Sequence, residues 1–528
     1  MTPDSPTIPA LLAHRRYEDA DLQAVVSDDA SISYRSLDDR TASLAERLAA
    51  SGMQKGSRVG LVMPNGVEWA VTALAVMRLG AVLVPLSTLL RTPELLAQLR
   101  VSSVTHLISV RSHRGRHYLD ELEAAVPGIR DHQSGSLRLP TIPALRYLWA
   151  WEDIPRSRLK NSLVRALEAT VRPSDDMAIM FTSGSRGTPK GVIHTHGNAL
   201  RAVASGLECR RVGHNERLYI PMPFFWMGGF GAGLLTALVA GATLLTEATP
   251  EPASTLRLLE RERVTLFRGW PDQAVRIAFD PAFLTTDLSS LRPGSLPAVL
   301  PPDEQPRPGA RANLFGMTES FGPYCGDRLD RDLPLSSFGS CGRPFEGIEL
   351  RIVSPESGAL AAPGEQGEIQ IRGSNMMRGI CGRHRSEVFT RDAYYPTGDL
   401  GSMNAEGYLF YVGRADDMFK VKGATVYPSE VEAALRAVPG VRQVHVTNVQ
   451  DDRGAERVGA AVVVSGVGEA DLAKAARDRL SSFKVPTVWK ILASDDDIPL
   501  LATGKVDKIG LQRILGVATP HDRCQARR

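Results

Sequence analysis

Cysteine is scarce in this chain of 528 residues. No two of its cysteines form a C-x-x-C pair, so the common zinc-binding and redox motifs are missing. Disulfide frameworks belong mostly to short, cysteine-rich secreted domains. The pattern therefore predicts reduced thiols and argues against a structural zinc site. The five cysteines are Cys209, Cys325, Cys341, Cys381 and Cys524.

An excess of one sign of charge is also lacking. The 62 basic and 59 acidic side chains leave a net charge of +3, so there is no basic footprint for nucleic acid. The first residues contain no apolar core of a signal peptide, and the last five, CQARR, are not a prenylation box. We therefore expect a cytoplasmic protein with no nucleic-acid partner.

Long apolar runs are rare, and the charge-free stretch 224–246 is the one that is long enough to span a bilayer. It contains five glycines, breaks at 239–242 and continues into the apolar segment TLLTE. This favours a buried helix, a turn and a buried strand over a transmembrane helix. Residues 67–90 repeat the plan, with Gly80 between an apolar helix and the strand AVLVPL. Helices that alternate with apolar strands predict an α/β fold with parallel sheets covered on both faces.

Lysine is rare as well, with ten lysines against 52 arginines and none between Lys190 and Lys420. Lys190, Lys420, Lys422 and Lys505 nevertheless lie in or beside glycine-containing, turn-like segments. An ammonium on a flexible stem is a movable point charge that a guanidinium does not replace. These four lysines are therefore candidates for function, with chance clustering of surface lysines as the alternative.

The segment TSGSRGTPKG, residues 182–191, has the composition of a phosphate-binding loop. Glycines let the backbone approach a ligand closely, and successive backbone N–H groups form a nest for anions. The Walker motif, however, needs Ser or Thr after Gly-Lys, and here Gly191 follows Lys190 and Val506 follows Lys505. A P-loop NTPase is therefore excluded, while polyphosphate binding remains the prediction. The candidate loop residues are Thr182, Ser183, Gly184, Ser185, Gly187, Thr188 and Lys190.

Six motifs occur in a characteristic order: TSGSRGTPKG, FGMTE at 315–319, GEIQIRG at 367–373, YPTGDL at 395–400, GRADDMFKVKG at 413–423 and ATGKVDK at 502–508. In that order they resemble the adenylate-forming superfamily of acyl- and aryl-CoA synthetases, peptide-synthetase adenylation domains and luciferases. The resemblance covers residues 21–510, approximately. It implies an α/β fold in which a large N-terminal domain of layered subdomains, 1–413, is joined by a hinge at 414–417 to a small mobile C-terminal α+β domain, 418–528.

Local sequence supports a separate C-terminal unit. Ser429 and Glu432 have the spacing of a capping box and predict the start of a helix that stops near Pro439-Gly440. The segment AAVVV, residues 460–464, predicts a strand of the same unit.

The resemblance also implies roles for single residues in the reaction with ATP. The loop 182–190 would hold the β- and γ-phosphates, and Glu319 would bind Mg²⁺, since a hard cation prefers carboxylate and phosphate oxygens. Lys505 would stabilise the charge that builds on the α-phosphate during adenylation. The remaining ATP contacts would be Phe315 at the adenine, Thr318 at a phosphate, and Asp399 with Arg414 at the ribose.

The second half-reaction would use the GRADDMFKVKG segment. The resemblance implies a rotation of the small domain about Asp416, with Gly423 and Lys422 lining the CoA tunnel and Lys420 assisting catalysis. For the acid, Trp226, Phe230 and Gly316 would form the pocket. We find no counterpart of the acidic residue that holds an amino group in peptide-synthetase domains, so we expect an apolar acid: fatty, alicyclic or aromatic.

We therefore predict an ATP-dependent acid–CoA ligase that uses ATP, Mg²⁺ and CoA and works as a monomer or homodimer without a transmembrane segment. Two alternatives stay open: loading of a carrier-protein thiol, and a degenerate member that only binds a nucleotide. Three departures from the family pattern are Arg186 in the phosphate loop, Leu500-Leu501 before ATGK, and a short segment, 292–308, with six prolines. The last of these is the main support for the degenerate alternative.

Overall fold

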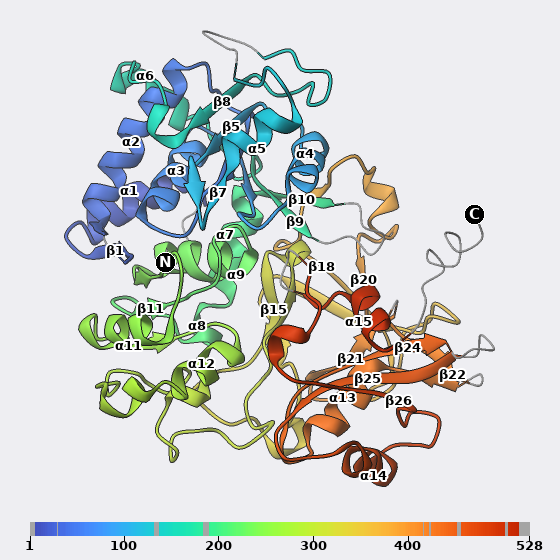
Figure 1. Cartoon of the computed structure of the whole chain (residues 1–528). Coiled ribbons are helices and arrows are strands. Elements are labelled where there is room, and N and C mark those ends of the chain that lie inside the picture. The colour runs from blue at the N-terminus through green and yellow to red at the C-terminus, as the bar shows by residue number, and fades with distance from the viewer. Residues whose placement is uncertain are drawn as a thin grey trace. The chain divides into compact units, whose positions relative to one another are not determined.

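The computed structural model describes residues 6–28, 30–130, 137–182, 189–415, 417–421, 424–450, 456–501 and 505–516 (Figure 1). The chain forms two compact units. The first consists of Met1–Leu350 with Ile371–Tyr395, and the second of Arg351–Gln370 with Pro396–Arg528. The predicted domain boundaries at 413 and 418 mark the two sides of a hinge. A division of the chain into compact units does not test a hinge, so these boundaries stay a prediction.

A seven-stranded sheet in the strand order β19-β10-β9-β4-β3-β5-β8 forms the centre of the first unit. Strands β9, β4, β3, β5 and β8 are parallel, while β10 is antiparallel to β9 and to β19. The strands are β3 (Arg58–Val62), β4 (Val82–Leu86), β5 (His106–Ser109), β8 (Tyr147–Ala150), β9 (Asp176–Thr182), β10 (Lys190–Thr195) and β19 (Gly379–Ile380).

Helices cover both faces of this sheet because alternate strand residues point to opposite sides. Leu83 and Ile108 pack into a core with the first three helices, whereas their neighbours Val84 and Leu107 pack against two others. The first set is α1 (Ile8–Glu18), α2 (Tyr34–Ala50) and α3 (Val67–Arg78), and the second is α4 (Thr92–Val101) and α5 (Tyr118–Ala125).

A five-stranded sheet in the order β13-β11-β12-β1-β2 shares the first of these cores. Its other face is covered by α11 (Pro252–Arg261) and α12 (Pro271–Ala278). Helices and sheets therefore alternate in layers, and the predicted parallel sheets covered on both faces are confirmed. The strands are β1 (Gln23–Val26), β2 (Ser31–Ser33), β11 (Arg217–Tyr219), β12 (Thr243–Leu245) and β13 (Leu266–Phe267), of which β2 is antiparallel.

The charge-free stretch 224–246 folds as predicted into a buried helix, a turn and a buried strand. It contains α9 (Met227–Gly229), a π-helical segment η2 (Phe230–Leu235) and α10 (Thr236–Ala240), followed by β12. Gly241 ends the helix at φ +72°, a left-handed conformation that glycine adopts without strain. Residues 67–90 confirm the same plan in α3, Gly80 and β4.

No helix among the residues given above is both long and apolar enough to cross a membrane.

The proline-rich segment 292–308 begins alongside β13 and does not form a long helix. The backbone N–H of Arg292 donates to Thr265 O and that of Leu296 to Phe267 O, both at 3.0 Å. Within this fully described segment, the helical residues are those of η4 (Pro297–Val299). A small antiparallel sheet follows: β14 (Phe315–Met317), the turn η5 (Thr318–Ser320), β15 (Gly322–Gly326) and β16 (Arg343–Pro344). Other short elements of this unit are β6 (Ser112–His113), β7 (Arg116–His117), α6 (Asn161–Glu168), α7 (His196–Ser205) and α8 (Leu207–Arg210).

The second unit contains most of a four-stranded sheet, a hairpin and a three-stranded sheet. The three-stranded sheet shares one hydrophobic core with α13 (Pro428–Arg436) and α14 (Glu469–Arg479), and a second core with α15 (Lys508–Ile514). The strands are β17 (Ile348–Val353), β18 (Gly367–Gly373), β20 (Tyr395–Met403), β21 (Leu409–Arg414), β22 (Phe419–Val421), β23 (Ala424–Val426), β24 (Val441–Gln450), β25 (Glu456–Val464) and β26 (Val488–Leu492).

The predicted capping box at α13 is wrong. Pro428 occupies the first turn, where a missing N–H costs nothing, so the helix begins one residue before Ser429. The Ser429 hydroxyl donates instead to Val412 O, and the Glu432 carboxylate accepts from the N–H of Val446 at 3.0 Å. The predicted strand at 460–464 is confirmed as part of β25, and the helix stops before Pro439 as expected.

Three buried histidines make the first unit sensitive to acid. Burial lowers the pKa of His106, His194 and His196 to about 4, from roughly 6.5 in an exposed chain. Between these values the unfolded chain takes up protons that the folded chain does not, so stability is lost as pH falls from about 6.5 towards 4.

We predict that the thermal unfolding midpoint of the wild-type protein is lower at pH 5 than at pH 7. The decrease should be smaller in the variant His106→Phe. The His106 ring stacks on Tyr147 with centroids 4.7 Å apart. Phenylalanine keeps this stacking and removes the titrating group. That group accounts for up to about one of the protons that the chain takes up on unfolding in this pH range. Melts at the two pH values measure the effect, and an equal fall in both proteins would contradict it.

Candidate functional site

The Lys190–Glu319 ion pair brings two of the predicted ATP-binding residues together. Lys190 is the first residue of β10, and Glu319 lies in the turn η5 between β14 and β15. The Lys190 ammonium lies 2.5 Å from Oε1 of Glu319. The hydroxyl of Tyr395 donates to the same oxygen at 3.0 Å, and Lys190 donates to that hydroxyl at 2.9 Å.

The Glu319 carboxylate is ionised although it is buried. Burial acts to raise its pKa, but the Lys190 ammonium and the Tyr395 hydroxyl outweigh burial and hold the pKa below its usual range. A buried carboxylate kept charged by neighbours that can move suits a hard cation that arrives with phosphate oxygens. The residues present therefore fit the predicted Mg²⁺, which would neutralise phosphate charge when bound.

Tyr395 and His194 are contributors that the sequence did not reveal. Tyr395 stands in the YPTGDL motif, but nothing in that motif pairs its hydroxyl with Glu319. His194 contacts the backbone of Thr318 across 124 positions of sequence.

Two more of the predicted ATP contacts are described: Thr318 is half-buried, and Thr182 at the end of β9 lies opposite Lys190 in the strand register.

Asp399 and Arg414 form the predicted pair in the second unit. They are register partners on the antiparallel strands β20 and β21, and the guanidinium donates to the Asp399 carboxylate at 3.1 Å. The same nitrogen donates to Thr397 O at 3.0 Å. Asp399 is 7% exposed, so its carboxylate is held in one place before any ligand binds. The arrangement is compatible with the predicted hydrogen bonds from ribose hydroxyls to the Asp399 carboxylate.

Lys505 is exposed, and its carbonyl oxygen accepts a hydrogen bond from the N–H of Leu501 at 2.7 Å. Lys420 is the middle residue of β22, and the structure describes only its backbone. Eight further predicted residues lie outside the described part of the chain: Ser183, Gly184, Ser185, Gly187, Thr188, Asp416, Lys422 and Gly423.

The residues predicted for the acid pocket and the adenine have different surroundings. Trp226 is half-buried and contacts Phe225 and Trp270 edge-to-face, at 5.2 and 5.7 Å. Phe230 is completely buried and belongs to the core of the first unit. Gly316 lies against the backbone of β15, where a Cβ would come within 2.3 Å of a carbonyl oxygen, so the hairpin itself requires glycine there. Phe315, the residue predicted for the adenine, packs edge-to-face on a tyrosine of β15.

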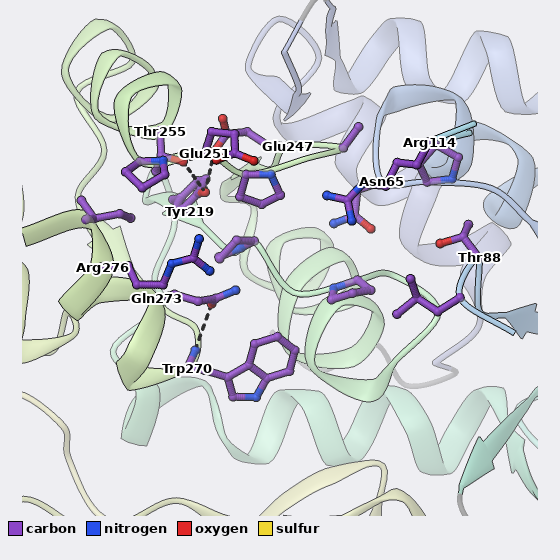
Figure 2. A pocket seen from close by; sticks show the side chains of 18 of the residues that line it. Asn65, Thr88, Arg114, Tyr219, Glu247, Glu251, Thr255, Trp270, Gln273 and Arg276 are labelled. Carbon is purple, nitrogen blue, oxygen red and sulfur yellow. Dashed lines mark hydrogen bonds between the residues drawn. The ribbon is translucent and has the colours of Figure 1, made fainter. Parts of the chain in front are cut away.

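A pocket of about 210 Å³ opens beside Trp270 (Figure 2). Its walls come from segments that follow parallel strands of both sheets, which is where open α/β sheets bind ligands. Asn65 joins these segments: its side-chain oxygen accepts from the N–H of Phe224 at 2.7 Å, and its nitrogen donates to Met222 O and Thr246 Oγ1 at 2.9 Å. The labelled polar and aromatic residues in the lining are Asn65, Thr88, Arg114, Tyr219, Glu247, Glu251, Thr255, Trp270, Gln273 and Arg276.

Glu247 contributes a buried carboxyl group to this pocket. Its oxygens accept from the hydroxyls of Tyr219 at 2.6 Å, Thr255 at 2.5 Å and Ser254 at 3.0 Å. Burial raises the pKa of Glu247, and these hydrogen bonds offset part of that effect. Exposed Arg114 and Arg276 add positive charge, so the pocket combines groups of both charges with apolar side chains such as Leu89, Phe225 and Ile277.

Comparison with known families agrees with this geometry. Residues 12–381 match the family described as AMP-binding enzyme, and residues 430–505 match the AMP-binding enzyme C-terminal domain. Because the first match covers more than half of the chain, the protein belongs to the AMP-binding enzyme family.

Two relatives are similar over nearly the whole chain. A feruloyl-CoA synthase from an Amycolatopsis species is 33% identical, with 93% of this chain and 96% of the relative covered. A Mycobacterium tuberculosis protein named 3-[(3aS,4S,7aS)-7a-methyl-1,5-dioxo-octahydro-1H-inden-4-yl]propanoyl:CoA ligase is 31% identical, with 97% and 100% covered. The crystal structure of the anthranilate CoA ligase AuaEII in complex with anthranoyl-AMP has the same fold, with a TM-score of 0.79 at 23% identity over 97% of each chain.

These findings confirm three predictions: membership of the adenylate-forming superfamily, the α/β fold with a large N-terminal and a smaller C-terminal domain, and the class of AMP-forming acid–thiol ligase.

We predict that Lys190→Met lowers both the stability of the protein and the rate of adenylation. The double variant Lys190→Met, Glu319→Gln should be more stable than Lys190→Met but should not recover the rate of adenylation. Removing one partner of a buried ion pair leaves the other charge unpaired, at about 3–5 kcal/mol, whereas removing both charges avoids that cost. Thermal melts and single-turnover pyrophosphate release separate the two effects. A double variant no more stable than Lys190→Met would contradict the role given to the ion pair.

Proposed function

We propose that this protein is a cytoplasmic, ATP-dependent carboxylic acid–CoA ligase that acts on an apolar acid through an acyl-adenylate. The observation that carries the proposal is the buried, ionised Glu319 carboxylate with Lys190 beside it. A chain with these residues, in a family of AMP-binding enzymes, has the means to hold a metal–nucleotide and neutralise its charge.

In the first half-reaction, the acid's carboxylate attacks the α-phosphorus of ATP and pyrophosphate leaves. Glu319 would hold the metal–phosphate group, and the Lys190 ammonium would turn from Glu319 to the phosphate oxygens as the nucleotide binds. Asp399 would accept hydrogen bonds from the ribose hydroxyls. The further assignments for this step are Lys505 at the α-phosphate, Phe315 at the adenine, Thr318 at a phosphate, and the loop 182–190 around the β- and γ-phosphates.

In the second half-reaction, the CoA thiol attacks the acyl carbonyl and AMP leaves. The proposed domains, 1–413 and 418–528, would exchange orientation about the hinge 414–417. That motion would replace Lys505 by the 413–423 segment, with Lys420, Lys422 and Gly423 at the CoA, because the two steps need different charges in one place.

The proposed acid is apolar and carries a ring. Trp226 presents an aromatic face supported by Phe225 and Trp270, and no charged residue lies between 224 and 246 to hold a polar substituent. Both similar ligases described above are named for acids with a ring system. Aromatic and alicyclic propanoic or propenoic acids are therefore the first to test, ahead of straight-chain fatty acids.

We assign the pocket in Figure 2 to the CoA arm rather than to the acid. Its amide, hydroxyl and carboxyl groups match the amides and hydroxyl of pantetheine, and the exposed guanidiniums of Arg114 and Arg276 match the phosphates. The pocket adjoins Trp226 through its contact with Trp270, so a thiol at its inner end would lie near the proposed acid wall.

The proposal is tested by incubating the protein with a panel of acids, ATP and Mg²⁺, with and without CoA, and detecting products by mass spectrometry. Acyl-AMP without CoA and acyl-CoA with it are the expected products. Acyl-AMP that does not convert with CoA would point to a carrier-protein thiol, and no adenylate with any acid would favour a protein that only binds a nucleotide.

We predict that Lys505→Ala slows acyl-AMP formation by ~10²-fold or more, because a positioned charge that acts on the transition state is worth that much. Conversion of supplied acyl-AMP to thioester should stay near the wild-type rate. Both half-reactions are measured separately by quench-flow. An equal loss in both would show that Lys505 has a structural role.

We predict that Arg276→Ala raises KM for CoA by about 5-fold, equivalent to ~1 kcal/mol for an exposed charge contact, and leaves KM for ATP within about 2-fold. The matched control is Arg257→Ala, which removes an exposed arginine of α11 outside the pocket. Steady-state kinetics with varied CoA provide the measurement. An unchanged KM for CoA in Arg276→Ala would argue against the pocket as the CoA site.

A further inference from the structure

Strand β10 presents two functional side chains on the same face, because Lys190 and His194 are four residues apart in an extended strand. Lys190 contacts the Glu319 carboxylate, whereas His194 contacts the backbone of Thr318, the residue before Glu319. Nε2 of His194 lies 2.8 Å from Thr318 O. The reaction proposed above gives this buried imidazole no role.

The hydrogen bonds around Asn198 determine which His194 nitrogen carries the proton. The backbone N–H of Thr195 can only donate, and it donates to Oδ1 of Asn198 at 2.7 Å. The other end of the amide is therefore the NH₂ group, which donates to Nδ1 of His194 at 2.9 Å. Nδ1 is thus an acceptor, and the proton lies on Nε2, directed at Thr318 O. Since a carbonyl can only accept, both ends of the imidazole agree on this tautomer.

The turn that His194 contacts has a backbone that needs support. Phe321 follows Glu319 and Ser320 and has φ +56°, a left-handed conformation that is uncommon for a bulky residue. Such a conformation persists where its surroundings hold it. The His194 ring packs edge-to-face on the Phe321 ring, with centroids 4.8 Å apart. His194 therefore holds the turn on both sides of Glu319.

A second contact fixes the backbone of Glu319 itself: the N–H of Met377 donates to Glu319 O at 2.8 Å. Together with His194, it holds the backbone while Lys190 and Tyr395 occupy the carboxylate. The backbone supports do not use the carboxylate oxygens, so they can persist when Lys190 and Tyr395 give way to a metal.

We propose that His194, oriented by Asn198, is a positioning residue that holds the Thr318–Phe321 turn and thereby places the Glu319 carboxylate for the metal–nucleotide. The inference rests on the proposed function in that Glu319 binds the metal. Partners that orient a metal ligand typically contribute about 10–100-fold in metal affinity.

The test compares three variants. His194→Leu removes the hydrogen bond, and His194→Gln keeps a side-chain N–H that can reach Thr318 O. The matched control is His196→Leu, because the His196 side chain is also fully buried and accepts a hydrogen bond away from the turn, at Nδ1 from the N–H of Ile8 at 3.2 Å. Thermal melts record the structural cost of each change.

Binding is measured without turnover, by electron paramagnetic resonance of Mn²⁺ with a non-hydrolysable ATP analogue. His194→Leu should weaken Mn²⁺ binding by about 10-fold or more, and single-turnover pyrophosphate release at limiting Mg²⁺ should fall in parallel. His194→Gln should recover most of the affinity. His196→Leu should lose thermal stability and keep wild-type Mn²⁺ binding.

The proposal is overturned if His194→Leu binds Mn²⁺ as the wild type does, or if His196→Leu weakens binding as much. Failure of the proposed function has a different signature. Wild-type protein that binds Mn²⁺ with the analogue but forms no acyl-AMP would overturn the reaction and leave the positioning result standing, whereas no Mn²⁺ binding at all would overturn both.

Discussion

A buried carboxylate that must stay charged is the constraint on which the first unit depends. Glu319 is 5% exposed, and an unpaired charge at such a position costs several kcal/mol. Lys190 removes that cost from 129 positions away, and the Tyr395 hydroxyl shares it. The strand register of β10, the short turn η5 and the start of β20 must all be correct for these three groups to meet. The site therefore exists only in the completed fold, and a ligand that replaces Lys190 finds the carboxylate in place.

The second organising feature is the carboxyl edge of the two parallel sheets. Loops that follow strands of both sheets meet there, and the Asn65 side chain satisfies its oxygen and its nitrogen across them. Asn65 thereby holds the segment that leads into Trp226 and one wall of the pocket in Figure 2. Burying an amide in this way is favourable only because each polar atom has a partner. The same contacts that close the core also shape the surface beside the proposed acid wall.

Much of the architecture could be predicted because it depends on local pattern. The charge-free stretch 224–246, with its glycines, indicated a helix, a turn and a strand, and the alternation of helices with apolar strands indicated parallel sheets. Prediction failed where two local signals competed. Ser429 and Glu432 have capping-box spacing, but Pro428 starts the helix earlier and leaves Glu432 to the N–H of Val446. The sequence contains both signals, and packing against β24 decides between them.

By itself, the sequence determined the kind of chemistry: six motifs in order, a glycine- and hydroxyl-rich loop that is not a Walker loop, and lysines at a few glycine-rich turns. Only the tertiary structure decided which groups act on one another. It assigned the Tyr395 hydroxyl to Glu319, placed Phe230 in the core of the first unit, and set the proton of His194 on Nε2 through Asn198. The physical reason is that charge state, tautomer and burial depend on contacts made across the fold, often between residues far apart in sequence, and no local pattern of residues encodes those contacts.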